Sequence, residues 1–151
     1  MFCTSPYIRV HIQNIKIMKN KKVVAIFYAD ARNLSGVKRI GTEVTSVPDD
    51  VWNEIDIEVP ADLQITSKIE DKNEIFTAKL VFRELRSSLR YRHIAAYKVR
   101  LADGSEMLIG NSERPYPVLT KDQNLSSGNS NSQLRELTVT YSDFKDIPYI
   151  I

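Results

Sequence analysis

Alternation of apolar and polar side chains over residues 89–101 constrains the fold more than any other feature of the sequence. One side of this segment carries Leu, Tyr, His, Ala, Tyr, Val and Leu, and the other carries four Lys or Arg residues. A period of two predicts a β-strand whose two faces meet different surroundings. Because globular strands are usually much shorter, we expect a bulge or bend near Ala95 and Ala96. Asp103-Gly104 then predicts a tight hairpin turn, after which residues 107–109 return antiparallel.

Alternation recurs at residues 54–59, 76–82 and 134–144 and predicts further strands there. Residues 23–28 predict a strand as a short β-branched and aromatic run, and residues 37–44 are a poorer candidate, interrupted by Gly41. Residues 71–73 predict a turn before one of these strands. Residues 46–52 differ, because a capping serine, a proline and early acids predict a single helical turn or a short helix. No strand–helix–strand spacing occurs. The expected fold class is therefore mostly β, an antiparallel β-sandwich or barrel with one short helix.

The chain has the size of one domain. Its 151 residues, 42% hydrophobic and 26% charged, have the composition of an ordinary globular unit. We expect a single β-rich domain over residues 18–151. Residues 1–17 are expected to be an N-terminal arm or a wrongly assigned start, with Met18 as the alternative initiator. Residues 120–133 are almost all polar and rich in Ser and Asn, which predicts a long polar loop.

The sequence lacks the residues that several classes of chemistry require. Its one cysteine, Cys3, cannot form an internal disulfide, and together with two histidines it cannot supply a usual zinc site. Glycine-rich phosphate loops are absent, and no apolar run nears the roughly 20 residues that cross a bilayer. His93 shares its face with Tyr91 and Tyr97, where a histidine is more often a hydrogen-bonded core or edge residue than a catalytic base. His11 has no partner signature, and the serine pairs lack the nucleophile motif. We expect no enzyme activity, no cofactor, no metal and no membrane contact.

Charge is sorted into blocks along the chain, although the net charge is only +2. Residues 1–42 carry eight Lys or Arg and one acid (+7), and residues 43–74 carry two Lys and ten acids (−8). Residues 79–100 carry seven Lys or Arg and one acid (+6), and residues 101–151 carry four basic and seven acidic residues (−3). Such blocks are either paired with each other inside the fold or directed at partners.

Two predicted strands carry complementary charge ladders. Glu54, Asp56 and Glu58 project from one strand, and the cations of 89–101 project from another: Arg90, Arg92, Lys98 and Arg100. Side by side in one sheet, these rows would pair internally. On separate surfaces, they would instead join copies head to tail. Arg114 and Tyr116, in the proline-rich segment 111–117, complete the predicted interface.

Nucleic-acid binding is the alternative hypothesis. It uses the basic segment 83–92, with Arg83, Arg86, Arg90 and Arg92 as the phosphate-binding candidates. Basic and aromatic residues on a sheet surface are typical of single-strand binding. Tyr91, however, alternates away from the neighbouring arginines, and no glycine–aromatic RNA-binding motif is present.

Residues 77–117 carry a resemblance, in the run YKVRLADGSEMLIGN followed by ERPYP. This quarter of the chain is similar to small phage or prophage virion proteins encoded among head and tail genes. The resemblance implies a structural role, such as a head–tail connector or tail-completion subunit, and it implies no catalytic residues. The expected function is therefore a non-enzymatic assembly protein, located in the cytoplasm or the virion. Its expected partners are copies of itself or other virion proteins, with nucleic acid as the alternative.

Overall fold

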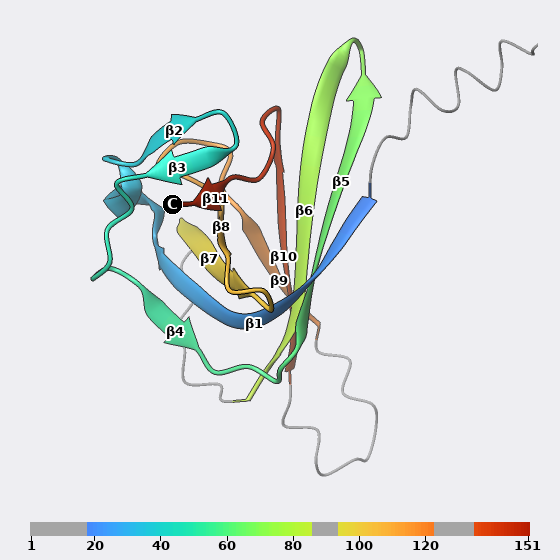
Figure 1. Ribbon diagram of the computed structural model, residues 1–151. Helices are drawn as coiled ribbons and strands as arrows, with labels where there is room; N and C mark the ends of the chain where they lie inside the picture. The colour runs from blue at the N-terminus through green and yellow to red at the C-terminus, as the bar shows by residue number, and fades with distance from the viewer. Residues whose placement is uncertain (1–17, 86–93, 123–134) are drawn as a thin grey trace, which may run out of the picture.

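The structure is a computed structural model that describes residues 18–85, 94–122 and 135–151 (Figure 1). Eleven strands form one sheet. In chain order they are β1 (Met18–Asp30), β2 (Lys38–Ile40), β3 (Glu43–Thr45), β4 (Asn53–Ile55), β5 (Ala61–Glu70), β6 (Asn73–Glu84), β7 (Ala95–Leu101), β8 (Glu106–Ile109), β9 (Val118–Asp122), β10 (Arg135–Asp143) and β11 (Tyr149–Ile150). Within the described ranges, the only helical element is the 3-10 turn η1 (Ala31–Leu34). The prediction of a mostly-β fold is confirmed.

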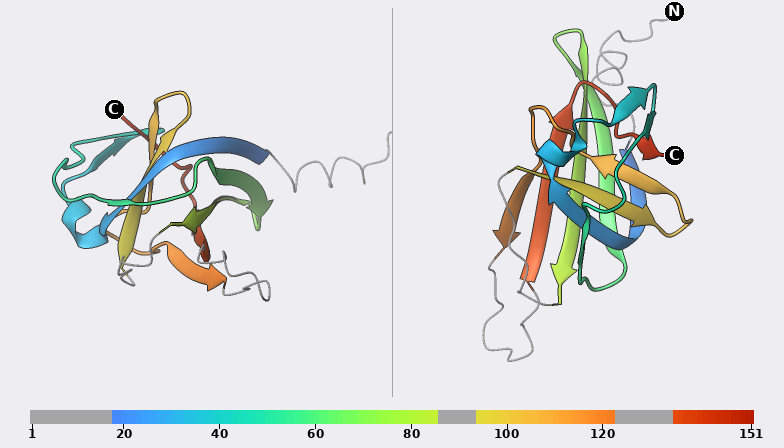
Figure 2. Two further views of the ribbon diagram at one scale, coloured as in Figure 1. Left: turned by 90° about the horizontal axis from the view of Figure 1, so that it is seen from below. Right: turned by 90° about the vertical axis from the view of Figure 1, so that its left-hand side faces the viewer.

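The sheet is continuous and strongly curved. Its strand order is β2-β3-β11-β8-β7-β1-β5-β6-β10-β9, with β4 also paired to β1. The pairings are antiparallel except that of β11 with β3. In the right-hand view of Figure 2, β9, β10, β6 and β5 run side by side, and β1, β7 and β8 cross in front of them. The two layers expected of a sandwich are therefore two halves of one open, mixed sheet.

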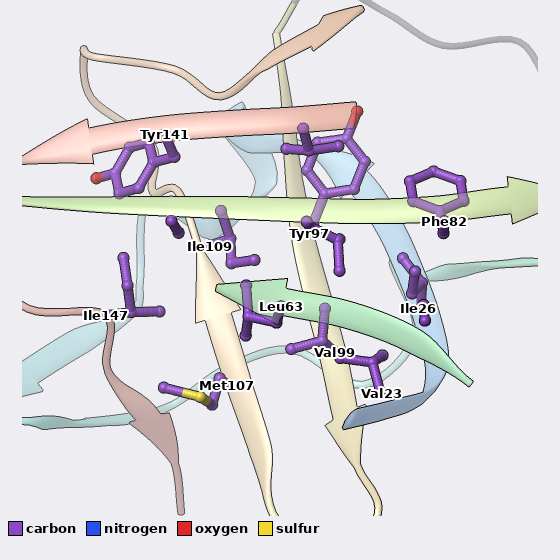
Figure 3. Packing of buried hydrophobic residues seen from close by; sticks show 14 of the residues in the cluster. Val23, Ile26, Leu63, Phe82, Tyr97, Val99, Met107, Ile109, Tyr141 and Ile147 are labelled. Carbon is purple, nitrogen blue, oxygen red and sulfur yellow. The ribbon is translucent and has the colours of Figure 1, made fainter. Parts of the chain in front are cut away.

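The inner side of the curved sheet encloses the main hydrophobic core (Figure 3). The apolar positions of the predicted strand 76–82 supply Ala78, Leu80 and Phe82, each at most 2% exposed. Large buried side chains from both halves of the sheet meet there: Ile26, Leu63, Leu80, Phe82, Tyr97, Met107, Ile109, Leu137 and Ile147. Burial of each contributes roughly 1.5–3 kcal/mol. This core fixes which face of every strand points inward.

A second, smaller hydrophobic cluster lies on the opposite side of β7 and β8. Its buried members are Ala31, Leu34, Val44, Ala96 and Leu108, contributed by η1, β3, β7 and β8. Half-buried side chains that include Trp52 and Tyr116 pack against it. Ala96 and Tyr97 are consecutive in β7, so this strand contributes to both clusters. One half of the sheet therefore has apolar contacts on its outer side as well as its inner side.

The two predicted tight turns are present. Asp71 and Lys72, with φ of 51° and 69°, form the two-residue connection between β5 and β6. Gly104, with φ of 93°, lies between β7 and β8. The Asp103 carboxylate accepts hydrogen bonds from the Ser105 hydroxyl (2.6 Å) and backbone N–H (2.9 Å), and these bonds hold the pKa of Asp103 below its usual value. Both turns fix the hairpin registers that place the outer-face side chains.

The prediction of a helical turn at residues 46–52 is wrong. This segment contains bends and no helix, and the helical turn lies earlier, at Ala31–Leu34. A serine that caps a helix N-terminus has an extended backbone. Ser46 instead has φ of 61°, in the left-handed region, so the chain turns away from a helical path at the expected cap.

Several predicted strands differ in length from the observed ones. The predicted strand 37–44 is divided into β2 and β3 by a turn at Gly41, whose φ is 62°. Within 54–59, only residues 54 and 55 belong to β4, although Ile57 forms an isolated bridge to Glu84. Of the strand predicted for 89–101, β7 covers Ala95–Leu101. Ala95 and Ala96 pair in regular register with β1, so the bulge or bend expected at these residues is not there, and a bend lies at Ile94 instead. Residues 86–93 lie outside the described residues.

Strands β5, β9 and β11 were not predicted. In β5, Ala61, Leu63 and Ile65 do alternate inward, but the later residues of the strand are only half-buried or exposed. Strand β9 includes residues 120–122 of the predicted polar loop, because these residues pair with β10. The rest of that loop and the predicted arm 1–17 lie outside the described residues.

Candidate functional site

The predicted acidic and basic rows lie in the same sheet, but their strands are not neighbours. Glu54 in β4 and Lys98 in β7 are both Cα partners of Phe27 in the intervening strand β1. Directly opposed residues of antiparallel strands project from the same side of the sheet. Glu54, Phe27 and Lys98 therefore form one row on the outer side, with an aromatic ring between the opposite charges.

Lys98 lies over aromatic rings. Its Nζ is 4.7 Å from the centroid of Phe27 and 5.2 Å from that of Trp52. The guanidinium of Arg100 is 5.4 Å from the same Phe27 ring, and its Nη2 is 3.2 Å from Oε2 of Glu106. Each cation over a ring contributes about 0.5–1 kcal/mol at an exposed site. We call Phe27, Trp52, Lys98 and Arg100 the cation–aromatic patch.

The rings of the patch are held in place by the fold. Phe27 lies in β1, between β4 and β7, so strands on both sides fix its backbone. The indole Nε1 of Trp52 donates a hydrogen bond to the carbonyl oxygen of Pro48 at 2.7 Å, and the ring packs against the second cluster. Phe27, Trp52 and Lys98 are each half-buried. The patch thus presents pre-positioned aromatic surface and positive charge together.

The other two acidic residues of the row lie along β6. The backbone N–H of Leu85 donates to the carbonyl of Asp56 (2.9 Å), and that of Glu58 donates to the carbonyl of Arg83 (2.8 Å). The Glu58 carboxylate is 4.0 Å from the Arg83 guanidinium, which is also 3.8 Å from Glu136. Glu58, at this end of the acidic row, is therefore paired with a cation of the same chain, Arg83.

The same contacts bear on the nucleic-acid candidates. Of the four arginines, the structure describes Arg83, which lies near the end of β6 between the two carboxylates of Glu58 and Glu136. Arg86, Arg90 and Arg92 lie outside the described residues. Arg83, the member of this set that the structure describes, therefore has carboxylate partners and is not part of the cation–aromatic patch.

Arg114 and Tyr116 have different roles in the bent segment 111–117. The Tyr116 hydroxyl donates to the carbonyl oxygen of Ser112 at 3.2 Å, and its ring packs against the second cluster. Tyr116 therefore anchors the segment 111–117 to the second cluster. Arg114 is exposed and lines a cavity together with Arg39. Of the nine predicted interface residues, the structure brings Lys98 and Arg100 together in the patch, with Glu54 in the same row.

Sequence reasoning did not assign Phe27 and Trp52 to the candidate surface. A signal for Phe27 is present in the predicted strand 23–28, where Phe27 and Tyr28 are consecutive. Consecutive strand residues point to opposite sides, so one of two adjacent aromatic rings has to lie on the outer face. Trp52 carries no comparable signal, because its position depends on the irregular backbone of residues 46–52.

The patch offers non-covalent binding rather than reactive groups: two cations, two aromatic rings and a nearby carboxylate. In the part of the chain that the structure describes, no cluster of three or more His, Cys, Asp or Glu side chains could hold a metal ion. Nor does a helix long and apolar enough to span a membrane occur in those residues. The chain matches no protein-family model, no curated protein and no solved structure.

Proposed function

We propose that the chain is a non-enzymatic structural subunit that assembles with further copies of itself through the cation–aromatic patch. We propose further that this assembly is part of a phage or prophage virion, of the head–tail connector or tail-completion type. The observation that carries the assembly is the position of Lys98 and Arg100 over the Phe27 ring. The virion component rests on the resemblance of residues 77–117.

The composition of the patch is typical of a protein–protein interface. Aromatic residues and arginine are enriched in such interfaces, and Trp and Arg are among the residues that dominate their binding energy, whereas lysine is depleted there. Lys98 forms no ion pair with another described residue, so an arriving carboxylate would not have to displace one. Phe27 and Trp52 would supply the apolar contact that excludes water around that new pair.

A second copy of the chain can supply the complementary charge. Asp49, Asp50 and Glu54 are exposed side chains of the acidic block 43–74. Because Glu54 lies in the same row as Lys98, this acidic surface adjoins the patch. Contact between the acidic surface of one copy and the patch of the next would give a two-fold pair of copies, or a ring where the contact is head to tail and the rotation closes. Complementary charge would also speed association and make it sensitive to salt.

Sedimentation velocity over a range of protein concentrations, at roughly 0.02 M and 0.5 M NaCl, tests the proposal. We expect concentration-dependent oligomers at low salt that weaken at high salt. The double variant Lys98→Glu/Arg100→Glu should be monomeric under both conditions. The matched control, Lys72→Glu/Lys79→Glu, makes the same change in net charge on the β5–β6 hairpin and should assemble normally.

Two outcomes would overturn the proposal. One is a strictly monomeric chain at high concentration and low salt, and the other is equal loss of assembly in both double variants. Titration with a fluorescent single-stranded oligonucleotide examines the alternative function. Salt-sensitive binding that disappears in Arg90→Glu/Arg92→Glu would favour nucleic-acid recognition over self-assembly.

A further inference from the structure

A cavity of about 350 Å³ lies between β2, the segment 111–117 and the segment after β10. This volume falls within the range of small-molecule sites, which is about 300–1,000 Å³. Three cations far apart in the sequence line the cavity: Arg39, Arg114 and Lys145. The cavity does not include any residue of the cation–aromatic patch, so it is a separate feature of the molecule.

Arg39 is held firmly without being neutralised. Its Nε donates to the carbonyl oxygen of Gly41 at 2.9 Å, and its Nη2 donates to that of Asp146 at 2.6 Å. Both acceptors are uncharged backbone groups, so the guanidinium keeps its full positive charge. Arg114 and Lys145 are exposed, and none of the three cations forms an ion pair with another described residue. Three positively charged residues, none of them ion-paired within the described part of the chain, thus line one cavity.

The two carboxylates in the cavity wall offset this positive charge only in part. Both oxygens of Asp143 are engaged, one by the Tyr141 hydroxyl (3.0 Å) and the other by the backbone N–H of Phe144 (2.7 Å). Burial, with the nearby Asp143 charge, raises the pKa of Tyr141 far above its ordinary range, so its phenol stays protonated and keeps donating. Glu113 is exposed. With three cations and two acids, the lining has a net charge of +1.

Contacts within the segment hold the wall that carries Arg114 in its conformation. Gly110 has φ of 101°, and a Cβ at this position would lie 2.8 Å from the Pro117 ring, so the backbone and the ring are in close contact. The Asn111 side chain accepts a hydrogen bond from the backbone N–H of Glu113 at 2.8 Å. Tyr116 closes the loop through its bond to Ser112. Binding of a ligand would therefore cost little conformational entropy for ordering this segment.

From these observations we infer that the cavity is a binding site for a small anion, a molecule that carries a phosphate or carboxylate group. The planar guanidinium groups of Arg39 and Arg114 match the oxygens of either group, and Lys145 adds a point charge. Arg39 is the fixed element of the site, whereas Arg114 and Lys145 close on the anion from two sides.

The test is a titration of the full chain with inorganic phosphate and, separately, with succinate, followed through backbone amide NMR shifts. Sodium chloride keeps the ionic strength constant. We expect saturable shifts in residues 110–117 and 143–148 with at least one of the two anions. The double variant Arg114→Gln/Lys145→Gln should bind at least tenfold more weakly. Its matched control, Lys72→Gln/Lys79→Gln, removes two exposed cations elsewhere and should bind like the unmodified chain.

Three results would overturn the inference: no saturable shift with either anion, unchanged affinity in Arg114→Gln/Lys145→Gln, or equal weakening in both double variants. Thermal unfolding of each variant shows whether it is folded. Because Arg114 and Lys145 are exposed, both double variants should melt within a few degrees of the unmodified chain. The titration is done at concentrations where the chain is monomeric, so its result does not depend on the proposed assembly.

Discussion

The two outer faces of the curved sheet carry their charges differently. Where β1 meets β5 and β6 meets β10, cations and carboxylates face each other across neighbouring strands, as in the ion pairs Lys22–Asp62 and Arg83–Glu136. Where β1 meets β7, Lys98 is opposite Phe27 instead. Strand register therefore decides which charges are paired inside the chain. The net charge of a sequence segment therefore does not give the charge that is available to a binding partner, because some of its charged side chains are already paired within the chain.

The largest contrast should appear when an apolar side chain is removed from each outer face. Trp52→Ala loses packing on the second cluster and the bond to Pro48, so the free energy of unfolding should fall by about 3 kcal/mol. Val81→Ala, on the outer face of β6, should cost less than about 1 kcal/mol. Urea denaturation measures both. Equal losses would mean that the two outer faces contribute equally to stability.

A pH titration compares the outer side of β7 with its inner side. Burial, with a smaller contribution from Tyr28, raises the pKa of Tyr97 to about 12. An exposed tyrosine ionises near pH 10, so the unfolded chain loses this proton first. The contribution of Tyr97 to the free energy of unfolding should be fully present below about pH 10. It should fall by roughly 2–3 kcal/mol as the pH rises to 12.

Denaturant unfolding at several pH values between 9 and 12 tests this decline. Tyr97→Phe should reduce the pH dependence, leaving the part that comes from Tyr141, whose pKa is also raised by burial. Lys98→Met, the adjacent change on the outer side, should leave the decline intact. A stability that stays constant from pH 10 to 12 would contradict the burial of the Tyr97 hydroxyl.

The smallest effect is expected for the exposed ion pairs. Arg83 is about half exposed, and its two pairs with Glu58 and Glu136 are 3.8–4.0 Å long. Arg83→Gln should therefore lower the free energy of unfolding by no more than about 1 kcal/mol. The loss should shrink in 1 M NaCl, where the Debye length is about 3 Å. A loss above 2 kcal/mol in thermal or urea unfolding would show that these pairs stabilise the fold more than their exposure implies.

Much of the core could be predicted from the sequence because a half-buried strand has to alternate. Leu80 and Phe82 in β6, and Leu137 and Val139 in β10, occupy every second position of the predicted strands 76–82 and 134–144, and all four are buried. The turn at Gly104 could be predicted because a left-handed backbone favours glycine. These features depend on residues close together in the sequence.

The rest depends on contacts between distant segments. The cation–aromatic patch exists because β1 pairs with both β4 and β7, and no local pattern specifies those partners. Ser46 has the right side chain for a helix cap, but its backbone follows the path that brings Trp52 onto the second cluster. The cavity containing Arg39 is also assembled from segments distant in sequence. Individual candidate residues could therefore be identified from the sequence, but which of them lie together in the folded chain could not.

Strand β11 has a consequence for the order in which the molecule can form during translation. In the sheet, the early hairpin of β2 and β3 joins the remaining strands through β11, which lies between β3 and β8. A ribosome releases that hairpin long before it synthesises Tyr149 and Ile150. Until then, β3 lacks the strand that pairs with its second edge, so the β2–β3 hairpin, with strands of three residues each, has little to stabilise it.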